Sequence, residues 1–299
     1  VEGTTTPIIA SAWQQATAEQ YSTLAIPYIV YNPSGLTAEI TLKVGSTVLK
    51  TLTVDRTEQV WSYRADEVGA LSLSIVCGSV TKTFATTVTE STVNVEAETA
   101  DLALHLTASG RSNTEANKSS WSYGSIVASL TGFNWTSDGW VTDADGITAL
   151  RVAGDARVTI PLQIFAQDFR TTGKTIELEF ATRDVMDYDA TVISCLSGGR
   201  GIKVTAQKAS LTSEQSEVST QYKEDEHVRL AFVVEKRSEN RLILVYINGI
   251  LSGAVQYPTD DDFSQSSPVG ISIGSNSCTT DIYGIRVYNN SLTRYQVLN

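Results

Sequence analysis

The sequence predicts an all-β protein made of two β-sandwich domains. Apolar or alternating runs rich in Val, Ile, Thr and Tyr recur along the chain at a spacing of about 8 to 12 residues, which is typical of sandwiches. Helical periodicity is nearly absent, and only residues 12–20 and the tail from residue 292 favour a short helix. The chain has 299 residues. One hydrophobic core usually stops growing at about 250 to 300 residues, which favours two domains.

Short strand patterns follow one another in the first region, with turn signals such as "NPSG" and "DEVG" between them. They cover residues 23–31, 38–44, 46–54, 58–65, 71–78 and 81–88. About ninety residues with six or seven strands is the size of an immunoglobulin-like sandwich. No cysteine pair has the spacing found in antibody domains, so the match is to the architecture of immunoglobulin-like spacers of bacteria and phages.

A polar, acidic stretch at residues 89–104 separates this pattern from the next, and we place the boundary near residue 95. The predicted domains are therefore 1–95 and 96–299. In the second region the dipeptide Asn248-Gly249 stands between two apolar runs and predicts a β-hairpin, because both residues tolerate positive φ. Strand patterns there cover residues 147–154, 156–165, 174–183, 190–198, 201–207, 227–236, 241–257, 269–275 and 280–289.

Three stretches of the second region carry a family resemblance: "GKTIELEFATRD" (173–184), "VYINGILSG" (245–253) and "DIYGIRVYNNSLT" (281–293). They resemble the concanavalin A-like jelly roll of the LamG and lectin/glucanase superfamily, which has two curved antiparallel sheets. The order of motifs over 101–299 is also similar to modules in large structural proteins of phages of gut Firmicutes, where such modules follow immunoglobulin-like domains. The resemblance implies a fold more than a function, because jelly rolls host many functions.

Charge and composition exclude several classes of partner. Acidic residues outnumber basic ones by 33 to 22, and the net charge of −11 is not interrupted by any Lys/Arg cluster. This disfavours binding to nucleic acid or to an anionic membrane. No apolar run reaches the ~20 residues of a membrane helix, so we expect no membrane insertion. The N-terminus "VEGTTTP" lacks an initiator Met and the pattern of a signal peptide, and we expect a piece of a longer protein.

The three cysteines, Cys77, Cys195 and Cys278, are widely separated, and each lies inside an apolar run. Neither a disulfide framework nor a zinc site has this spacing. We expect buried free thiols, and a bridge between Cys195 and Cys278 is the alternative that the sequence leaves open.

The superfamily includes glucanases whose catalytic strand carries a Glu-x-Asp-x-x-Glu pattern. Retaining hydrolysis needs two carboxylates about 5 Å apart. In "IELEFATRD" Glu177 and Glu179 alternate as required, but Thr182 stands where the acid/base belongs. We therefore predict that the protein is not an enzyme, and we interpret Glu177 and Glu179 as the solvated face of a strand. His105 and His227 lack a nearby nucleophile motif, and we interpret both as structural.

Calcium is the cofactor that the resemblance raises, because lectin-type and LamG jelly rolls often hold it in loops at the rim of the sheets. Since calcium takes about six to eight oxygen ligands, several carboxylates must converge. The best candidate is "RDVMDYD", where Asp184, Asp187 and Asp189 follow a strand, and the alternative is a solvated loop. The clusters "DADG" (143–146) and "TDDD" (259–262) are weaker candidates, and the second is typical of an exposed turn.

Sugar-binding modules stack pyranose rings on exposed aromatic side chains. Polar surroundings favour exposure in "SSWSYGS", and two further tyrosines lie in loop-like contexts. The candidate stacking residues are Trp121, Tyr123, Tyr188 and Tyr222. We interpret Trp135 and Trp140 as anchors at the start of the sheet, because the Asp-Gly pairs beside them are turn chemistry.

These observations together predict a non-enzymatic adhesion protein, with a spacer domain followed by a jelly roll that binds a glycan on a host surface. The setting we expect is the virion surface of a phage, or an extracellular bacterial surface. The alternative is a purely structural module that decorates a virion and binds other protein subunits. A glycoside hydrolase is a third and weaker alternative.

Overall fold

The computed structural model describes residues 6–96, 101–143, 146–164, 172–236, 241–263 and 269–298. The chain divides into two compact units, Val1–Val95 and Glu96–Asn299. Every regular element among the described residues is a β-strand, and the strands form sandwiches, so the predicted all-β class is confirmed. Of the two stretches expected to form a helical turn or two, the first is wrong, because residues 17–19 form a strand. The second forms turns at 294–298, with a hydrogen bond from Val297 N–H to the Thr293 carbonyl (3.0 Å).

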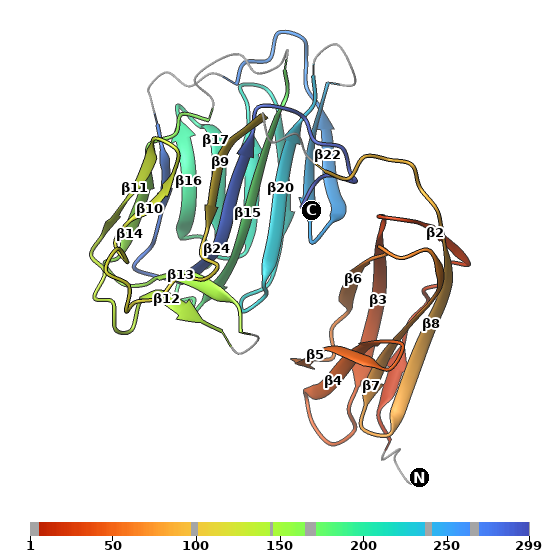
Figure 1. The fold of residues 1–299 in the computed structure, drawn as a ribbon. Helices are drawn as coiled ribbons and strands as arrows, with labels where there is room; N and C mark the ends of the chain where they lie inside the picture. Colours follow the sequence, from red (N-terminus) through yellow and green to blue (C-terminus); the bar gives the residue numbers. More distant parts are fainter. Residues whose placement is uncertain are drawn as a thin grey trace. The chain divides into compact units, whose positions relative to one another are not determined.

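The N-terminal unit packs a three-stranded sheet against a five-stranded one (Figure 1). The first has the order β1 (Ile8–Ala10), β3 (Thr23–Tyr31), β6 (Gln59–Arg64), and the second the order β2 (Thr17–Glu19), β8 (Val80–Thr89), β7 (Gly69–Cys77), β4 (Ala38–Val44), β5 (Thr47–Val54).

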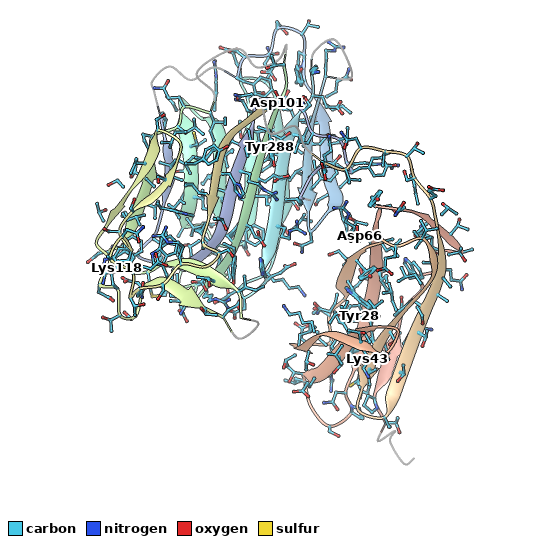
Figure 2. All side chains as sticks on the ribbon, in the orientation of Figure 1. Tyr28, Lys43, Asp66, Asp101, Lys118 and Tyr288 are labelled. Atoms are coloured by element: carbon cyan, nitrogen blue, oxygen red, sulfur yellow. The ribbon has the colours of Figure 1, made fainter. Side chains whose placement is uncertain are left out.

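Strict alternation along β3 builds the core of this unit. Leu24, Ile26, Tyr28 and Val30 are buried, while the residues between them face outward, as expected for a strand with one buried face. Tyr28 can be followed among the packed side chains in Figure 2. Trp61 on β6 joins the same core. The β2 strand pairs with β8 in parallel, whereas the other pairs in this unit are antiparallel. Membership of the immunoglobulin-like family stays a prediction.

The C-terminal unit has two large sheets, which we call sheet I and sheet II. Sheet I has the order β10 (Trp121–Tyr123), β11 (Ile126–Thr131), β14 (Arg157–Ile160), β23 (Ile271–Ile273), β16 (Thr191–Ser197), β17 (Arg200–Thr205), β18 (Lys208–Thr212), β19 (Glu217–Gln221). Sheet II has the order β12 (Gly139–Thr142), β13 (Thr148–Val152), β24 (Thr279–Tyr288), β15 (Lys174–Arg183), β20 (Val228–Val234), β21 (Leu242–Ile247), β22 (Ile250–Gln256). A further strand, β9 (Leu102–Thr107), pairs with β24 on the side that β13 also uses (Figure 1).

The large core of this unit lies between the two sheets. On β15, Ile176, Leu178 and Phe180 are buried in it. Glu177 and Glu179 alternate with them, so they project from the opposite face of sheet II, which we call the outer face.

A β-bulge on β24 changes what this strand presents to the outer face. Glu179 pairs with Gly284, but its neighbour Phe180 pairs with Ile282, so β24 carries one extra residue at Tyr283. A bulge leaves one residue unpaired and re-aims the side chains around it. Because Ile282 and Ile285 both belong to the core, the two residues between them lie together on the outer side.

The hairpin predicted at Asn248-Gly249 joins β21 to β22, with φ of 52° at Asn248 and 82° at Gly249. The Asn248 side chain also accepts a hydrogen bond from the Arg229 backbone N–H (2.9 Å) and donates one to Glu226 (3.1 Å). It therefore fixes the start of β20 as well as the turn.

We expect Asn248→Ala to destabilise the C-terminal unit by about 1 to 3 kcal/mol, because alanine is strained at left-handed φ and loses both hydrogen bonds. The midpoint of urea unfolding measures this loss. Asn248→Gly keeps the allowed φ and loses only the hydrogen bonds, so it should fall between wild type and the alanine variant. Equal effects of the two variants would contradict the role given to the backbone angle.

All three cysteines are free and buried, as expected, and the alternative bridge between Cys195 and Cys278 is absent. Burial raises the pKa of the Cys77 and Cys278 thiols. Among the described residues, no helix has the length and hydropathy that crossing a membrane requires.

Candidate functional site

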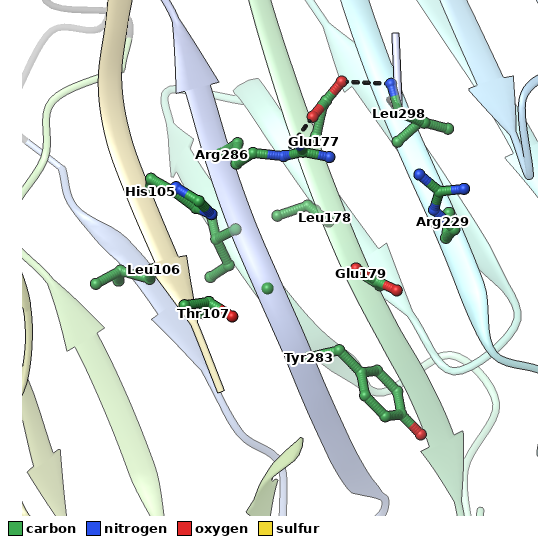
Figure 3. A pocket seen from close by; sticks show the side chains of 12 residues that line it. His105, Leu106, Thr107, Glu177, Leu178, Glu179, Arg229, Tyr283, Arg286 and Leu298 are labelled. Atoms are coloured by element: carbon green, nitrogen blue, oxygen red, sulfur yellow. Dashed lines mark hydrogen bonds and ion pairs between the residues drawn. The ribbon is translucent and has the colours of Figure 1, made fainter. Parts of the chain in front are cut away.

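A pocket of about 210 Å³ opens on the outer face of sheet II, over β24 and β15 (Figure 3). Its floor and walls come from β9, β15, β20, β24 and the C-terminal segment. The side chains with polar groups that line it are His105, Thr107, Glu177, Glu179, Arg229, Tyr283 and Arg286. Five strands and segments that are distant in sequence therefore converge on one hollow.

Glu177 stands at one end of the pocket and is held by two groups. Its Oε1 accepts a hydrogen bond from the backbone N–H of Leu298 (2.6 Å), and Nε of Arg286 lies 2.8 Å from Oε2. The Arg286 contact lacks the alignment of a hydrogen bond, so it acts as an ion pair. Glu177 is only 3% exposed, and burial raises its pKa against the opposing effect of Arg286.

Glu179 stands nearer the other end and is paired with a histidine. Its Oε1 lies 2.8 Å from Nε2 of His227, and the His227 ring stacks on Tyr283 at 4.0 Å and 12°. Burial alone would raise the pKa of Glu179. The hydrogen bond and charge of His227, together with Arg229, lower it below its usual value instead. The bulged Tyr283 thus supports the partner of a pocket carboxylate.

A second ion-pair cluster lies beside the pocket on the same face. Asp281 is fully buried, and its two oxygens accept hydrogen bonds from Nε and Nη2 of Arg151 (both 2.8 Å). Nε of Arg183 donates to the same carboxylate (2.7 Å). Nη2 of Arg183 also donates to the hydroxyl of Tyr283 (3.5 Å), and Tyr283 lines the pocket, which ties this cluster to it. The same hydroxyl donates to Asp143 (3.2 Å).

The charged side chains that line the pocket are of both signs. Glu177 and Glu179 oppose Arg229 and Arg286, so the formal charges of these four lining side chains sum to zero, and His227 pairs with Glu179 from outside the lining. Burial, and then the charge of Arg286, lower the pKa of His105, which keeps it neutral at pH 7. Carboxylates accept and guanidinium groups donate hydrogen bonds, so the site suits a neutral ligand rich in hydroxyl groups.

The interpretation of Glu177 and Glu179 as a solvated strand face is wrong for Glu177, which is buried, whereas the side chain of Glu179 is 36% exposed and remains partly solvated. Two carboxylates whose pKa values are pushed apart are also a feature of acid/base pairs. However, Oε1 of Glu177 accepts a hydrogen bond from Leu298, its Oε2 is held in an ion pair by Arg286, and Oε1 of Glu179 contacts His227, so each carboxylate has a fixed partner. Thr182 is buried on the other face, where its hydroxyl donates to the carbonyl of Ala206 (3.0 Å), so it adds no third group.

Two of the candidate stacking residues are buried in the core, which corrects the expectation that they are exposed. Trp121 is 2% exposed, its Nε1 donates to the Thr107 carbonyl (3.0 Å), and its ring packs edge-on against Trp140 at 5.6 Å. Tyr222 is 7% exposed and donates to the Thr205 carbonyl. Neither ring has a free face for a sugar. Trp140, interpreted as an anchor, is buried as expected.

The other two candidates lie nearer the surface and apart from each other. Tyr123 is half-buried and does not line the pocket, but its ring centroid lies 6.4 Å from that of His105, which does. Tyr188 is 46% exposed and donates to Glu224 (3.0 Å) in the loop after β15. Tyr188 does not line the pocket.

The carboxylates proposed as calcium ligands do not converge. Asp184, Asp187 and Asp189 are not buried, and Asp187 accepts a hydrogen bond from the Asp189 backbone N–H (3.0 Å) instead of turning to a shared centre. Within the described ranges, no three His, Cys, Asp or Glu side chains are placed to hold a metal ion. Asp145 lies outside the described residues. Asp261, expected in an exposed turn, is buried and bonded to Ser213.

Sequence reasoning missed the pocket because its polar residues come from strands that are far apart in the chain. His105 and His227 are isolated in sequence, yet one lines the pocket and the other holds Glu179. The sequence signal that could have indicated the pocket is the pair of charged residues, Glu177 and Glu179, at alternate positions in an otherwise apolar strand. Arg286 follows the same pattern inside "YGIRVY".

Comparison with known proteins gives weak structural likenesses. No protein-family model and no curated protein sequence matches the chain. The chain is similar to the binding domain of botulinum neurotoxin DC in complex with SialylT, with TM-score 0.47, 14% identity and coverage of 66% of this chain. It spans about half of that neurotoxin chain (49%).

Two further solved structures are similar to this chain. One is the CBM40 of the Ruminococcus gnavus IT-sialidase bound to alpha2,3 sialyllactose, with TM-score 0.33, 15% identity and coverage of 43% of this chain and 82% of that chain. The other is a candidate carbohydrate-binding protein from Bacteroides ovatus, with TM-score 0.35, 9% identity and coverage of 96% and 83%. All three TM-scores lie below 0.5, so no argument about function rests on them.

Proposed function

We propose that the C-terminal unit is a non-catalytic saccharide-binding module and that a neutral sugar occupies the pocket on the outer face of sheet II. The observation that carries this proposal is the balanced set of two carboxylates and two guanidinium groups around one hollow of about 210 Å³. Such a set offers donors and acceptors on several sides of a ligand without a net charge.

The polar groups are held in place before any ligand arrives. Glu177 is fixed by Arg286 and the Leu298 backbone, and Glu179 is fixed by His227. Preorganised groups bind more tightly because fewer rotamers are lost on binding. A few well-placed polar groups in a concave site are the usual source of orientation and specificity for small ligands.

The net charge of −11 supports a neutral rather than a strongly acidic saccharide. A polyanion would approach against the overall field of the protein, which lowers its association rate and its affinity. Arg286, the Leu298 backbone and His227 hold the two glutamates as fixed acceptors, which supports binding over the proton transfers of hydrolysis. We further propose that the protein serves as an adhesion part of a phage virion or bacterial surface, with the N-terminal unit as a spacer.

We expect Arg229→Ala and Glu179→Gln each to weaken binding at least tenfold, since each removes a charged hydrogen-bonding group worth about 1.5 to 3 kcal/mol. A glycan array identifies the sugar, and isothermal titration calorimetry then measures the affinity of each variant. Lys203→Ala is the matched control, because Lys203 is an exposed charge on β17 of the other sheet.

Three results would contradict parts of this proposal. Equal loss in the Lys203→Ala control would place the binding site elsewhere. A silent array together with self-association in sedimentation would support the alternative, a structural module that binds other protein subunits. Release of reducing ends from a bound glycan would contradict the non-catalytic role.

A further inference from the structure

The outer face of sheet II continues beyond the pocket as an apolar strip. Two residues further along β24 from Arg286 lies Tyr288, and two further along β20 from Arg229 lies Ala231, followed by Val233. Alternate residues share a face, so this strip is the direct continuation of the pocket floor. Tyr246 on β21 pairs with Ala231 and belongs to the same strip.

The C-terminal segment 292–298 covers this strip. Leu292, Val297 and Leu298 pack against it in one small apolar cluster with the two tyrosines. Tyr246 and Tyr288 are each only 6% exposed under this cover. Figure 2 labels Tyr288 on β24, near the end of sheet II where the segment packs.

Three hydrogen bonds from the segment, and one from Ser291 just before it, hold the segment in place. Ser291 donates to the Val234 carbonyl (2.8 Å), and Leu292 N–H donates to Thr175 (2.9 Å). Gln296 donates to the Glu96 carbonyl (3.0 Å) near the far end. The last hydrogen bond is the one from Leu298 N–H to Glu177, which closes the segment onto the pocket.

Leu298 is the residue at which the pocket and the covered strip meet. It lines the pocket and also belongs to the apolar cluster (Figure 3). Its φ is 62°, a left-handed conformation that is unfavourable for leucine. This left-handed conformation lets the Leu298 N–H reach Glu177, so the position of the Leu298 side chain beside the pocket is fixed by a specific hydrogen bond.

We infer that segment 292–298 sets the length of the saccharide that the site accepts. This inference rests on the proposed function of the pocket. In the wild type, a glycan running along the strands meets Leu298 after one sugar residue. With the segment displaced, Tyr246 and Tyr288 become a platform on which a second and third residue stack. The specificity is for a single terminal neutral residue, and the wall that enforces it is Leu298.

The experiment uses the full chain and linear oligomers of glucose, galactose and mannose of one to six units. For wild type we expect the affinity for each binding series to stay constant within about twofold as the oligomer lengthens, since added residues make no contact. In Val297→Ser/Leu298→Ser, the affinity should rise about three- to tenfold from the monosaccharide to the trisaccharide, as expected for stacking on tyrosine.

A second variant tests the inference in case the double variant unfolds. Leu298→Gly suits the left-handed φ and keeps the N–H that binds Glu177, while it removes the side chain that forms the wall. It should gain affinity for the disaccharide while hydrogen exchange shows the segment still docked. Thermal denaturation measures how much of the cost of losing the buried leucine side chain is offset by the relieved φ. Leu251→Ser is the matched control, because Leu251 is 51% exposed on β22, and its oligomer profile should match wild type.

The outcomes separate this inference from the proposed function. If no oligomer and no array glycan binds wild type or variants, the proposed function fails, and the inference fails with it. If wild type binds and its affinity already climbs with length, the inference alone is overturned. It is overturned as well if hydrogen exchange shows a detached segment in the double variant while its affinities remain independent of length.

Discussion

Replacing Asp281 by alanine is expected to destabilise the C-terminal unit by about 3 to 5 kcal/mol, the usual cost of removing one partner from a buried ion pair. Its carboxylate is buried and joins Arg151 on β13 to Arg183 on β15 across β24. Without it, two guanidinium groups face each other, and each is only 26% to 31% exposed. Chemical denaturation followed by tryptophan fluorescence measures the loss.

A matched control lies in the same cluster. Asp225 also pairs with Arg183 (3.1 Å), but its side chain is 69% exposed. Exposed ion pairs contribute about 0 to 1 kcal/mol because water screens them. We therefore expect Asp225→Ala to cost less than about 1 kcal/mol. Similar losses for the two variants would show that burial of Asp281 is not what makes it important.

Trp121→Ala is expected to destabilise the same unit by about 3 to 5 kcal/mol, since it leaves a large cavity in a closely packed core. It also removes the hydrogen bond to Thr107 and the edge-on contact with Trp140. The midpoint of thermal or urea unfolding measures the change. Below the unfolding transition, the affinity for the sugar should stay within about threefold of wild type, because Trp121 does not line the pocket.

Tyr188→Ala serves as the control for this variant, because Tyr188 is an exposed aromatic residue of the same unit. Surface substitutions usually change stability by less than about 0.5 kcal/mol, and we expect that here. If instead Trp121→Ala keeps full stability and abolishes binding, Trp121 belongs to the ligand site and the assignment of the pocket to the outer face is wrong.

The fold was predictable from the sequence where local patterns decide the structure. Alternation in "TLAIPYIVY" and the Asn248-Gly249 turn both appear as expected, because side-chain period and allowed φ are local properties. The site was less predictable. The polar residues next to Trp121 in sequence favour its exposure. It is buried instead because it packs against the ring of Trp140, which lies 19 residues further along the chain.

The burial of Glu177 on β15 was mispredicted for a similar reason. Its alternation with apolar residues is a correct guide to the strand, yet alternation gives only the face on which a side chain lies. Whether that face meets water depends on what covers it. Here the cover includes Leu298, which is 121 positions away from Glu177 in sequence. A contact between residues so far apart, such as that of Leu298 with Glu177, cannot be recognised from the pattern of a single sequence.

The central place of β24 in sheet II also has a consequence for the order of folding. This strand lies near the end of the chain, yet β9, β13 and β15 all pair with it. Sheet II therefore cannot close until nearly the whole of these 299 residues has left the ribosome. The last strand of the N-terminal unit ends at Thr89, so that unit can fold much earlier during synthesis. Until β24 is synthesised, the edges of β15 and β9 that pair with it stay unpaired. Because unpaired strand edges are prone to aggregation and long-range pairing is slow, we expect the C-terminal unit to fold more slowly than the N-terminal unit and to be the more prone to aggregate.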